Sequence, residues 1–233
     1  MNTRTRWTSL FKGRITQFSP PRTGSTLVWN ALKVAFPDRR IRKKHRLRRK
    51  ERSRLFPQSL VCTVRAPHEA VASSCLRASD TPDDESIRQA VKIVGNAFED
   101  LAAVHKYPNV LLLRYEAFYT HHPHIFEQLE EFFRLQLEPE LKERFYEQFA
   151  LDKVREKSMA LGAFSRMDAS DEIHGRHVSK YGGEPGTAGK VFNAAQLNFI
   201  HTELQPMYSE FGYDPPETAV PEERASSHEG SNG

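Results

Sequence analysis

The chain has 233 residues, of which 38% are hydrophobic and 27% charged, so it is polar for a globular protein but too apolar to be disordered throughout. Its length suits one hydrophobic core, because single cores keep growing to about 250 to 300 residues. No run of 18 apolar residues occurs, and the first 14 residues lack the apolar centre of a signal peptide, so we expect a soluble cytoplasmic protein without a membrane span.

Charge is distributed unevenly along the sequence. The formal net charge is +4, and eleven Lys or Arg residues against one acid, Glu51, fall between Arg39 and Arg54. The last twenty residues show the opposite imbalance and contain Pro, Ser and Gly. We therefore expect one domain over residues 1–213 and an acidic, disordered tail over residues 214–233.

The first part of the chain contains two strand–loop–helix units. Alternating polar and apolar residues over 14–19 predict a strand, and helical spacing resumes at residues 27–35 after a loop containing Gly24. The apolar run 60–64 predicts a buried strand, followed by a helix over residues 67–76. One cysteine falls in that strand and one in that helix, so we expect two buried thiols and no disulfide.

A third unit follows. Asp83 and Asp84 can cap a long helix whose apolar positions run from Ile87 to Val104 at intervals of three or four residues. Residues 109–114 then contain a continuous apolar run over 110–113, as expected for a parallel central strand covered on both faces.

The rest of the chain is predicted to be helical apart from one long loop. We expect packing helices over residues 125–135 and 139–157, a glycine-rich loop over residues 158–190, and a last helix over residues 194–211 interrupted by Pro206. Strands that alternate with helices indicate an α/β fold: a single domain with a central, mostly parallel sheet flanked by helices.

The loop of residues 19–26 has the chemistry of an anion site. A helix start offers free N–H groups and a positive dipole end, to which Arg22 adds full charge and Ser25 and Thr26 add hydroxyl donors. Gly24 allows the backbone to turn tightly. The common nucleotide P-loop is excluded, because the G-x-x-x-x-G-K-[ST] spacing is absent and no Lys immediately precedes Ser25. The competing interpretation of this loop is an ordinary strand-to-helix turn with a Ser or Thr cap.

A second candidate anion site follows the strand over 60–64. Arg65 ends that strand, and Ser73 lies on the helix that Pro67 begins, so one anion could meet a guanidinium and a hydroxyl together. A surface Arg beside a helix cap is the alternative.

Together these loops resemble the nucleotide-binding segments of the sulfotransferases that use 3′-phosphoadenosine 5′-phosphosulfate. That family has a P-[KR]-[ST]-G-[ST]-[ST] loop, matched by residues 21–26, and later R-x-P with a Ser eight residues after the Arg, matched by Arg65, Pro67 and Ser73. Tyr115 with Glu116 resembles the family's strand that ends in Tyr-Glu. The competing interpretation of Tyr115 is an ordinary half-buried Tyr at the end of a strand.

The resemblance implies a P-loop-NTPase-like sulfotransferase architecture and a site for this donor. Residues 22–26 would hold the 5′-phosphosulfate, Arg65 and Ser73 the 3′-phosphate, and Tyr115 would lie near the adenine. The implied donor-binding set is Arg22, Thr23, Gly24, Ser25, Thr26, Arg65, Ser73, Tyr115, Arg176 and Lys180. The last two belong to a late loop that only loosely matches the family's closing R-K-G and G-x-x-G segment.

The catalytic residues implied are His45, Lys43 and Arg22. Lys43, Lys44 and His45 resemble the Lys-x-His of the family's cytosolic branch, in which imidazole could accept the acceptor's proton and Lys43 could neutralise the leaving oxygen. His45 as one more member of a solvated basic run is the competing interpretation. Arg22, in place of Lys, is closer to bacterial or Golgi-type members.

The sequence therefore predicts transfer of a sulfuryl group to a hydroxyl or amine of a small-molecule or saccharide acceptor that it does not identify, without a metal. One alternative is a P-loop-type small-molecule kinase, which would need a Walker Lys and a carboxylate for Mg²⁺ that we do not find. Another is a nucleic-acid-binding module on the basic run over 39–54. We consider it unlikely because that run contains no aromatic residue before Phe56 to stack on bases.

Overall fold

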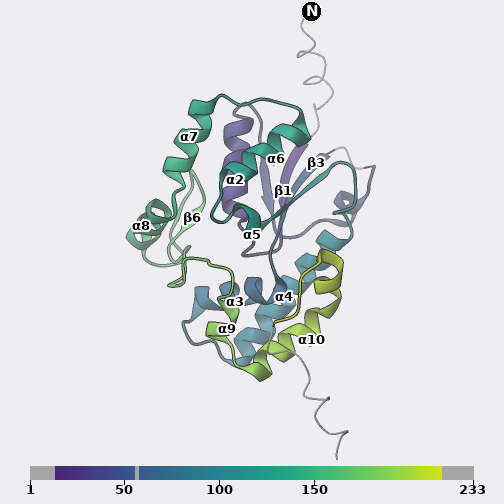
Figure 1. Ribbon diagram of the computed structural model, residues 1–233, viewed down its shortest axis with the longest axis vertical. Coiled ribbons are helices and arrows are strands. Elements are labelled where there is room, and N and C mark those ends of the chain that lie inside the picture. The colour runs from purple at the N-terminus through teal and green to yellow at the C-terminus, as the bar shows by residue number, and fades with distance from the viewer. Residues whose placement is uncertain (1–13, 56–57, 217–233) are drawn as a thin grey trace, which may run out of the picture.

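The computed structural model describes residues 14–55 and 58–216 (Figure 1). Within these residues a four-stranded sheet has the order β2–β1–β3–β4, and every neighbouring pair is parallel. Its strands are β1 (Arg14–Phe18), β2 (Arg42–Lys44), β3 (Gln58–Val64) and β4 (Val110–Arg114). The predicted α/β class with a parallel central sheet is confirmed. Most of the predicted acidic tail, beyond residue 216, lies outside the described residues.

Helices cover both faces of the sheet (Figure 1). One face packs against α2 (Ser25–Ala35) and α6 (Pro123–Phe133), and the other against α3 (Pro67–Ala78), α4 (Asp84–Ala102) and α10 (Ala194–Phe211). Alternate residues of β3 belong to different cores: Val61 packs on the α2 side, whereas Leu60 and Cys62 pack on the α3 side. All seven residues of β3 are buried, which explains its continuous apolar run.

The strand–helix units form as the sequence predicts. Asp83 caps α4, because its carboxylate accepts a hydrogen bond of 2.8 Å from the Ser86 backbone N–H. Cys62 and Cys75 are buried free thiols, as expected. In the described part of the chain, no helix is both long and apolar enough to cross a bilayer.

The region after β4 differs from the prediction. It contains α5 (Tyr115–Phe118), α7 (Pro139–Gln148), α8 (Leu151–Leu161) and α9 (Ala188–Val191), with a short antiparallel pair of β5 (Met167–Asp168) and β6 (Ile173–His174). The single helix predicted over 139–157 is wrong, because the backbone turns extended at Ala150 and separates α7 from α8. The predicted loop over 158–190 therefore includes the end of α8, β5–β6 and the start of α9.

Pro206 does not interrupt the last helix. It lies inside α10, which is continuous from Ala194 to Phe211. Pro206 is exposed, so water can solvate the Thr202 carbonyl that loses its backbone partner, and the helix tolerates the proline.

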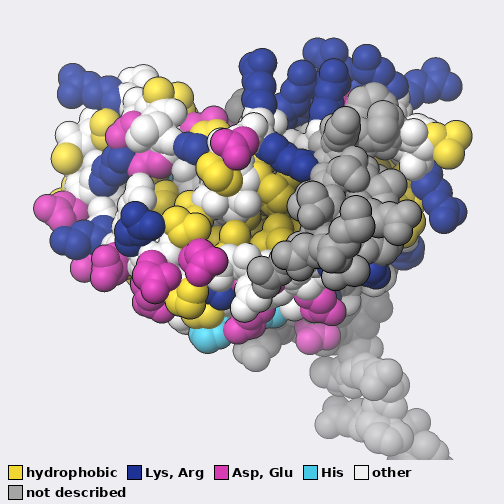
Figure 2. All heavy atoms as spheres, turned by 90° about the horizontal axis from the view of Figure 1, so that it is seen from above, with side chains coloured by type: hydrophobic (Ala, Val, Ile, Leu, Met, Phe, Trp, Pro, Cys, Tyr) yellow, Lys and Arg dark blue, Asp and Glu magenta, His cyan; other side chains and the backbone are white. Residues whose placement is uncertain are grey.

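The basic run is built from an edge strand and a single 3₁₀ turn. It contains β2, and then η1 (Arg49–Arg52). Two of its cations pair with the buried carboxylate of Asp100 on α4, at 2.9 Å from Arg46 and 3.2 Å from Arg52. Figure 2 shows that Lys and Arg side chains gather on part of one face of the molecule. The basic run is thus a partly tethered surface strip and forms no regular helix face.

Candidate functional site: a cationic cavity at the carboxyl edge of the sheet

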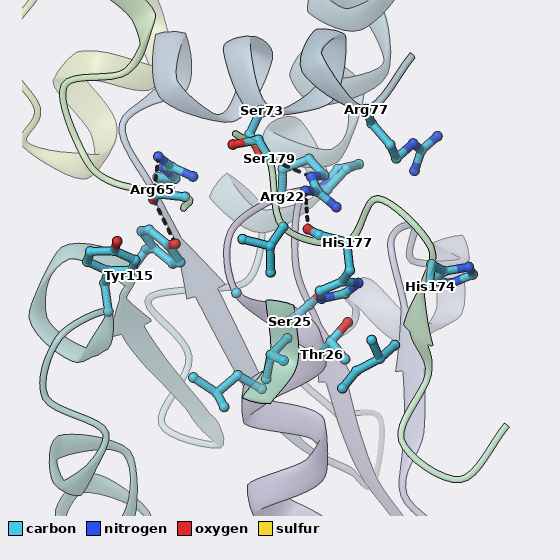
Figure 3. Close-up of a pocket in the computed structure, with 18 of the residues that line it drawn as sticks. Arg22, Ser25, Thr26, Arg65, Ser73, Arg77, Tyr115, His174, His177 and Ser179 are labelled. Atoms are coloured by element: carbon cyan, nitrogen blue, oxygen red, sulfur yellow. Dashed lines mark hydrogen bonds between the residues drawn. The ribbon is translucent and has the colours of Figure 1, made fainter. Parts of the chain in front are cut away.

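A cavity of about 420 Å³ opens where β1, β3 and β4 lead into α2, α3 and α5. Parallel strands place their carboxyl ends at one edge of the sheet, which is where ligands bind in open α/β folds. Nine predicted site residues line the cavity: Arg22, Gly24, Ser25, Thr26, Lys43, His45, Arg65, Ser73 and Tyr115. Several of these converge in Figure 3.

The loop between β1 and α2 is held in an uncommon backbone conformation. Arg22 and Gly24 have φ angles of 67° and 84°, in the left-handed region that favours glycine. A Cβ at position 24 would also lie 2.7 Å from the Phe118 ring. Gly24 is therefore required both by its dihedral angle and by the close approach of α5.

Buried hydroxyl groups fix this loop from behind. The Thr23 hydroxyl donates to the Pro20 carbonyl at 2.8 Å and lies 2.7 Å from the Thr63 hydroxyl of β3. The Ser19 hydroxyl accepts from the Thr63 backbone N–H at 2.9 Å. Thr23, which the resemblance places against the donor, is fully buried and supports the loop from outside the cavity lining.

The Arg22 guanidinium lies at the centre of the site. Its Nε donates to the Ser73 hydroxyl at 3.0 Å, and one terminal N–H group donates to the His177 carbonyl at 2.9 Å. Burial, followed by the positive charges of Arg77 and Arg65, lowers the pKa of Arg22 from 12.5 to about 10. Among the described residues no carboxylate pairs with Arg22. The cavity thus holds a positive charge that favours an anion.

Arg65 has a different environment. It is 2% exposed, and its Nη2 lies 3.0 Å from a Glu69 carboxylate oxygen and 3.0 Å from each of the carbonyls of Gly183 and Glu184. Its Nε is buried without a hydrogen-bond partner. Glu69 also accepts from the backbone N–H groups of Thr187 and Ala188. Arg65 and Glu69 therefore anchor residues 183–188 over the end of β3, and part of the Arg65 donor capacity is used within the protein.

Tyr115 closes the same side of the cavity. Its hydroxyl donates to the Gly183 carbonyl at 2.9 Å, and the Arg65 guanidinium lies 4.4 Å from its ring centre. Burial raises the pKa of Tyr115 to about 12, so the phenol is neutral at physiological pH.

Lys43 and His45 reach the cavity from the end of β2. Lys43 Nζ lies 2.7 Å from the Thr26 hydroxyl and 2.9 Å from the Glu172 carboxylate. His45 Nδ1 lies 2.9 Å from the Ser19 carbonyl, which can only accept, so Nδ1 carries the proton and Nε2 has a free lone pair. Loss of hydration lowers the pKa of His45 below 6.5, and the charge of Lys43 lowers it further.

The remaining predicted residues, Arg176 and Lys180, lie outside the cavity lining and are exposed. Sequence reasoning missed other lining residues, including Arg77, Phe164 and His174. His177, a loose match to the family's closing segment, also lines the cavity. His177 Nδ1 is buried without a partner, and burial with the charges of Arg22 and Lys43 lowers the His177 pKa to about 3. Among residues 14–55 and 58–216, no group of three His, Cys, Asp or Glu side chains could hold a metal ion.

Comparison with known proteins identifies the fold. No family model and no curated protein sequence matches the chain. Retinol dehydratase with androsterone and inactive cofactor PAP has a TM-score of 0.57 and 14% identity, covering 84% of this chain and 80% of that chain. Mouse sulfotransferase SULT7A1 complexed with PAP has a TM-score of 0.57 and 12% identity, covering 92% of this chain and 95% of that chain. Retinol dehydratase with retinol and PAP has a TM-score of 0.60 and 15% identity, covering 87% of this chain and 83% of that chain.

These matches extend over most of the chain, so this protein has the α/β fold of PAP-bound sulfotransferases. The fold that the sequence resemblance implied is confirmed.

Proposed function

We propose that the protein transfers a sulfuryl group from 3′-phosphoadenosine 5′-phosphosulfate to a hydroxyl or amine acceptor. The main support is the cationic cavity, in which Arg22 from the β1–α2 loop meets Ser73 from α3 and has no carboxylate partner among the described residues. A donor with negative groups at both ends of an adenosine suits two cationic strand–helix junctions that share one cavity.

In the proposed complex the 5′-phosphosulfate lies against residues 22–26, where Arg22, the α2 N-terminus and the Ser25 and Thr26 hydroxyls supply donors. The 3′-phosphate lies against Arg65 and Ser73, and the adenine near Tyr115. Arg176 and Lys180 would contact the 3′-phosphate only after their loop moves toward the cavity. A variant with both replaced by Gln would then bind PAP more weakly without a change in AMP affinity.

In the proposed reaction His45 acts as the general base. The acceptor oxygen or nitrogen forms a bond to sulfur while the bond from sulfur to the 5′-phosphate oxygen breaks, and PAP leaves with that electron pair. His45 Nε2 takes the proton of the acceptor. Lys43, which already touches Thr26, stabilises negative charge on the leaving oxygen.

The test is incubation with sulfur-labelled donor and a panel of hydroxylated and amine acceptors. Labelled product that is lost in His45→Ala, with PAP affinity retained, is the expected result. A parallel thermal-shift series with PAP, ATP with Mg²⁺ and a short DNA duplex separates the alternatives, because a ligand that binds only the folded state raises its stability. Stabilisation by ATP with Mg²⁺ or by the duplex, and none by PAP, would overturn the proposal.

A further inference from the structure

The cavity has a polar side and an apolar side. Figure 3 places Arg65 and Tyr115 on one side of Arg22, and Arg77 and His174 on the other. The apolar lining comes largely from α8 and from the segments around α7 and β5–β6. Its side chains are those of Phe149, Leu151, Val154, Phe164 and Ile173. In the proposed complex the donor occupies the side of Arg65 and Tyr115, which leaves the side of Arg77 for the acceptor.

Arg77 is built into the acceptor side by stacking. It lies four residues after Ser73 on α3, so both side chains share one helix face. Its guanidinium lies 4.0 Å from the centre of the Phe164 ring, which in turn stacks on His174 at 4.7 Å and 14°. Stacking uses the flat face of a guanidinium and leaves the N–H donors at its edge available to a ligand.

Those donors have no partner within the described part of the chain. Arg77 makes no hydrogen bond or ion pair there, although it lines the cavity. Its charge also acts on Arg22, whose pKa it helps to lower. Two neighbouring guanidiniums without a carboxylate repel each other, so an anion bound at Arg77 would remove part of that repulsion.

We infer that Arg77 binds an acidic group of the acceptor. The substrates would then be small molecules that carry a hydroxyl or amine to be sulfonated and, on an apolar body, a carboxylate or similar oxyanion. The apolar body packs against Phe164 and the neighbouring lining, and the oxyanion meets the edge of the Arg77 guanidinium. This inference rests on the proposed function.

The experiment compares acids with their uncharged amides. The probes are 4-hydroxybenzoate, 4-hydroxyphenylacetate and 3-(4-hydroxyphenyl)propanoate, each beside its amide. For every probe, KM in sulfuryl transfer and Kd for the PAP-saturated protein are measured in wild type, Arg77→Gln, Arg77→Lys and Lys92→Gln. Lys92 is an exposed α4 cation outside the cavity lining and serves as the matched control.

In wild type, at least one acid should bind about tenfold or more tightly than its amide, as a charge-assisted hydrogen bond provides. Arg77→Gln should remove that preference, leave the amide unchanged and leave PAP affinity unchanged. Arg77→Lys should keep part of the preference, because it keeps the charge but loses the planar fork. Lys92→Gln should behave as wild type.

Equal affinity for acid and amide in every pair would overturn the inference, even if sulfuryl transfer occurs. A loss of PAP affinity in Arg77→Gln without a loss of acid preference would also overturn it, because Arg77 would then belong to the donor site. Acid preference that depends on Arg77, but without sulfuryl transfer to any acceptor, would support the anion site and count against the proposed reaction.

Discussion

Replacing Arg22 should remove donor binding at little cost to the unliganded fold. The lowering of its pKa from 12.5 to about 10 corresponds to at most about 3.4 kcal/mol against the charged form, at 1.36 kcal/mol per pKa unit. Its left-handed backbone costs roughly 1 kcal/mol more. Opposing these terms are two hydrogen bonds, to Ser73 and to the His177 carbonyl, worth about 1.5 to 3 kcal/mol each.

These opposing contributions nearly cancel. Arg22→Gln keeps the left-handed backbone, so only the charge and hydrogen-bond contributions change. The free energy of unfolding should therefore fall by no more than about 3 kcal/mol, or roughly 6 to 12 °C in Tm for a domain of this size. Its PAP affinity should fall by about 100-fold, because the variant loses charge-assisted bonds to the 5′ group. The matched pair Arg22→Gly and Arg22→Ala separates the backbone term: the Gly variant should be more stable by about 1 kcal/mol.

The assay is urea unfolding of each unliganded variant, followed by calorimetric titration with PAP. Saturation at 100 times Kd should stabilise wild type by about 2.7 kcal/mol, and the same PAP concentration should barely stabilise Arg22→Gln. An Arg22→Gln protein that binds PAP like wild type, or that unfolds for lack of this side chain, would refute the reasoning.

Further predictions concern the neighbouring residues. His45→Ala should keep PAP affinity and lower kcat at least about 100-fold. Because the pKa of His45 lies below 6.5, the kcat of the wild-type protein should fall only when the pH drops below 6.5. A kcat that already falls with decreasing pH above pH 7 would exclude His45 as the base. Gly24→Ala should cost more than about 1 kcal/mol in urea unfolding, through its φ angle and its contact with Phe118, and more than Gly186→Ala, which has a similar φ but open space. Burial lowers the His177 pKa from 6.5 to about 3, so the unfolded chain protonates this imidazole more readily than the folded chain does. The free energy of unfolding should therefore fall as the pH drops from 6.5 toward 3. His177→Gln should make this fall shallower, and an unchanged pH dependence would contradict the burial of a neutral imidazole.

The sheet and the donor side of the cavity could be predicted because their signals are local. The continuous apolar run over 110–113 correctly predicts a strand with apolar contacts on both faces. Its predicted central position is wrong, because β4 is an edge strand of the sheet. The loop from Pro21 to Thr26 shows its cation, hydroxyls and glycine in six consecutive residues. Parallel pairing then brings this loop beside Arg65, as the register of β1 with β3 requires.

Other features depend on contacts between distant segments. Phe145 and Phe149 are buried at helical spacing across the end of α7, so periodicity conceals the break before α8. Phe164 and His174 come from an irregular stretch without a period, and no sequence signal places them in the cavity. Arg77 had a usable signal, because it follows Ser73 by four residues on one helix face.

The most direct test of the cationic cavity is the affinity of the wild-type protein for PAP and for AMP, which lacks the 3′-phosphate. Calorimetric titration of both nucleotides against one preparation measures what the second anion contributes. The account predicts that PAP binds at least about tenfold more tightly than AMP, and that Ser73→Ala reduces this difference. Equal affinities for the two nucleotides, or no binding of either, would contradict it.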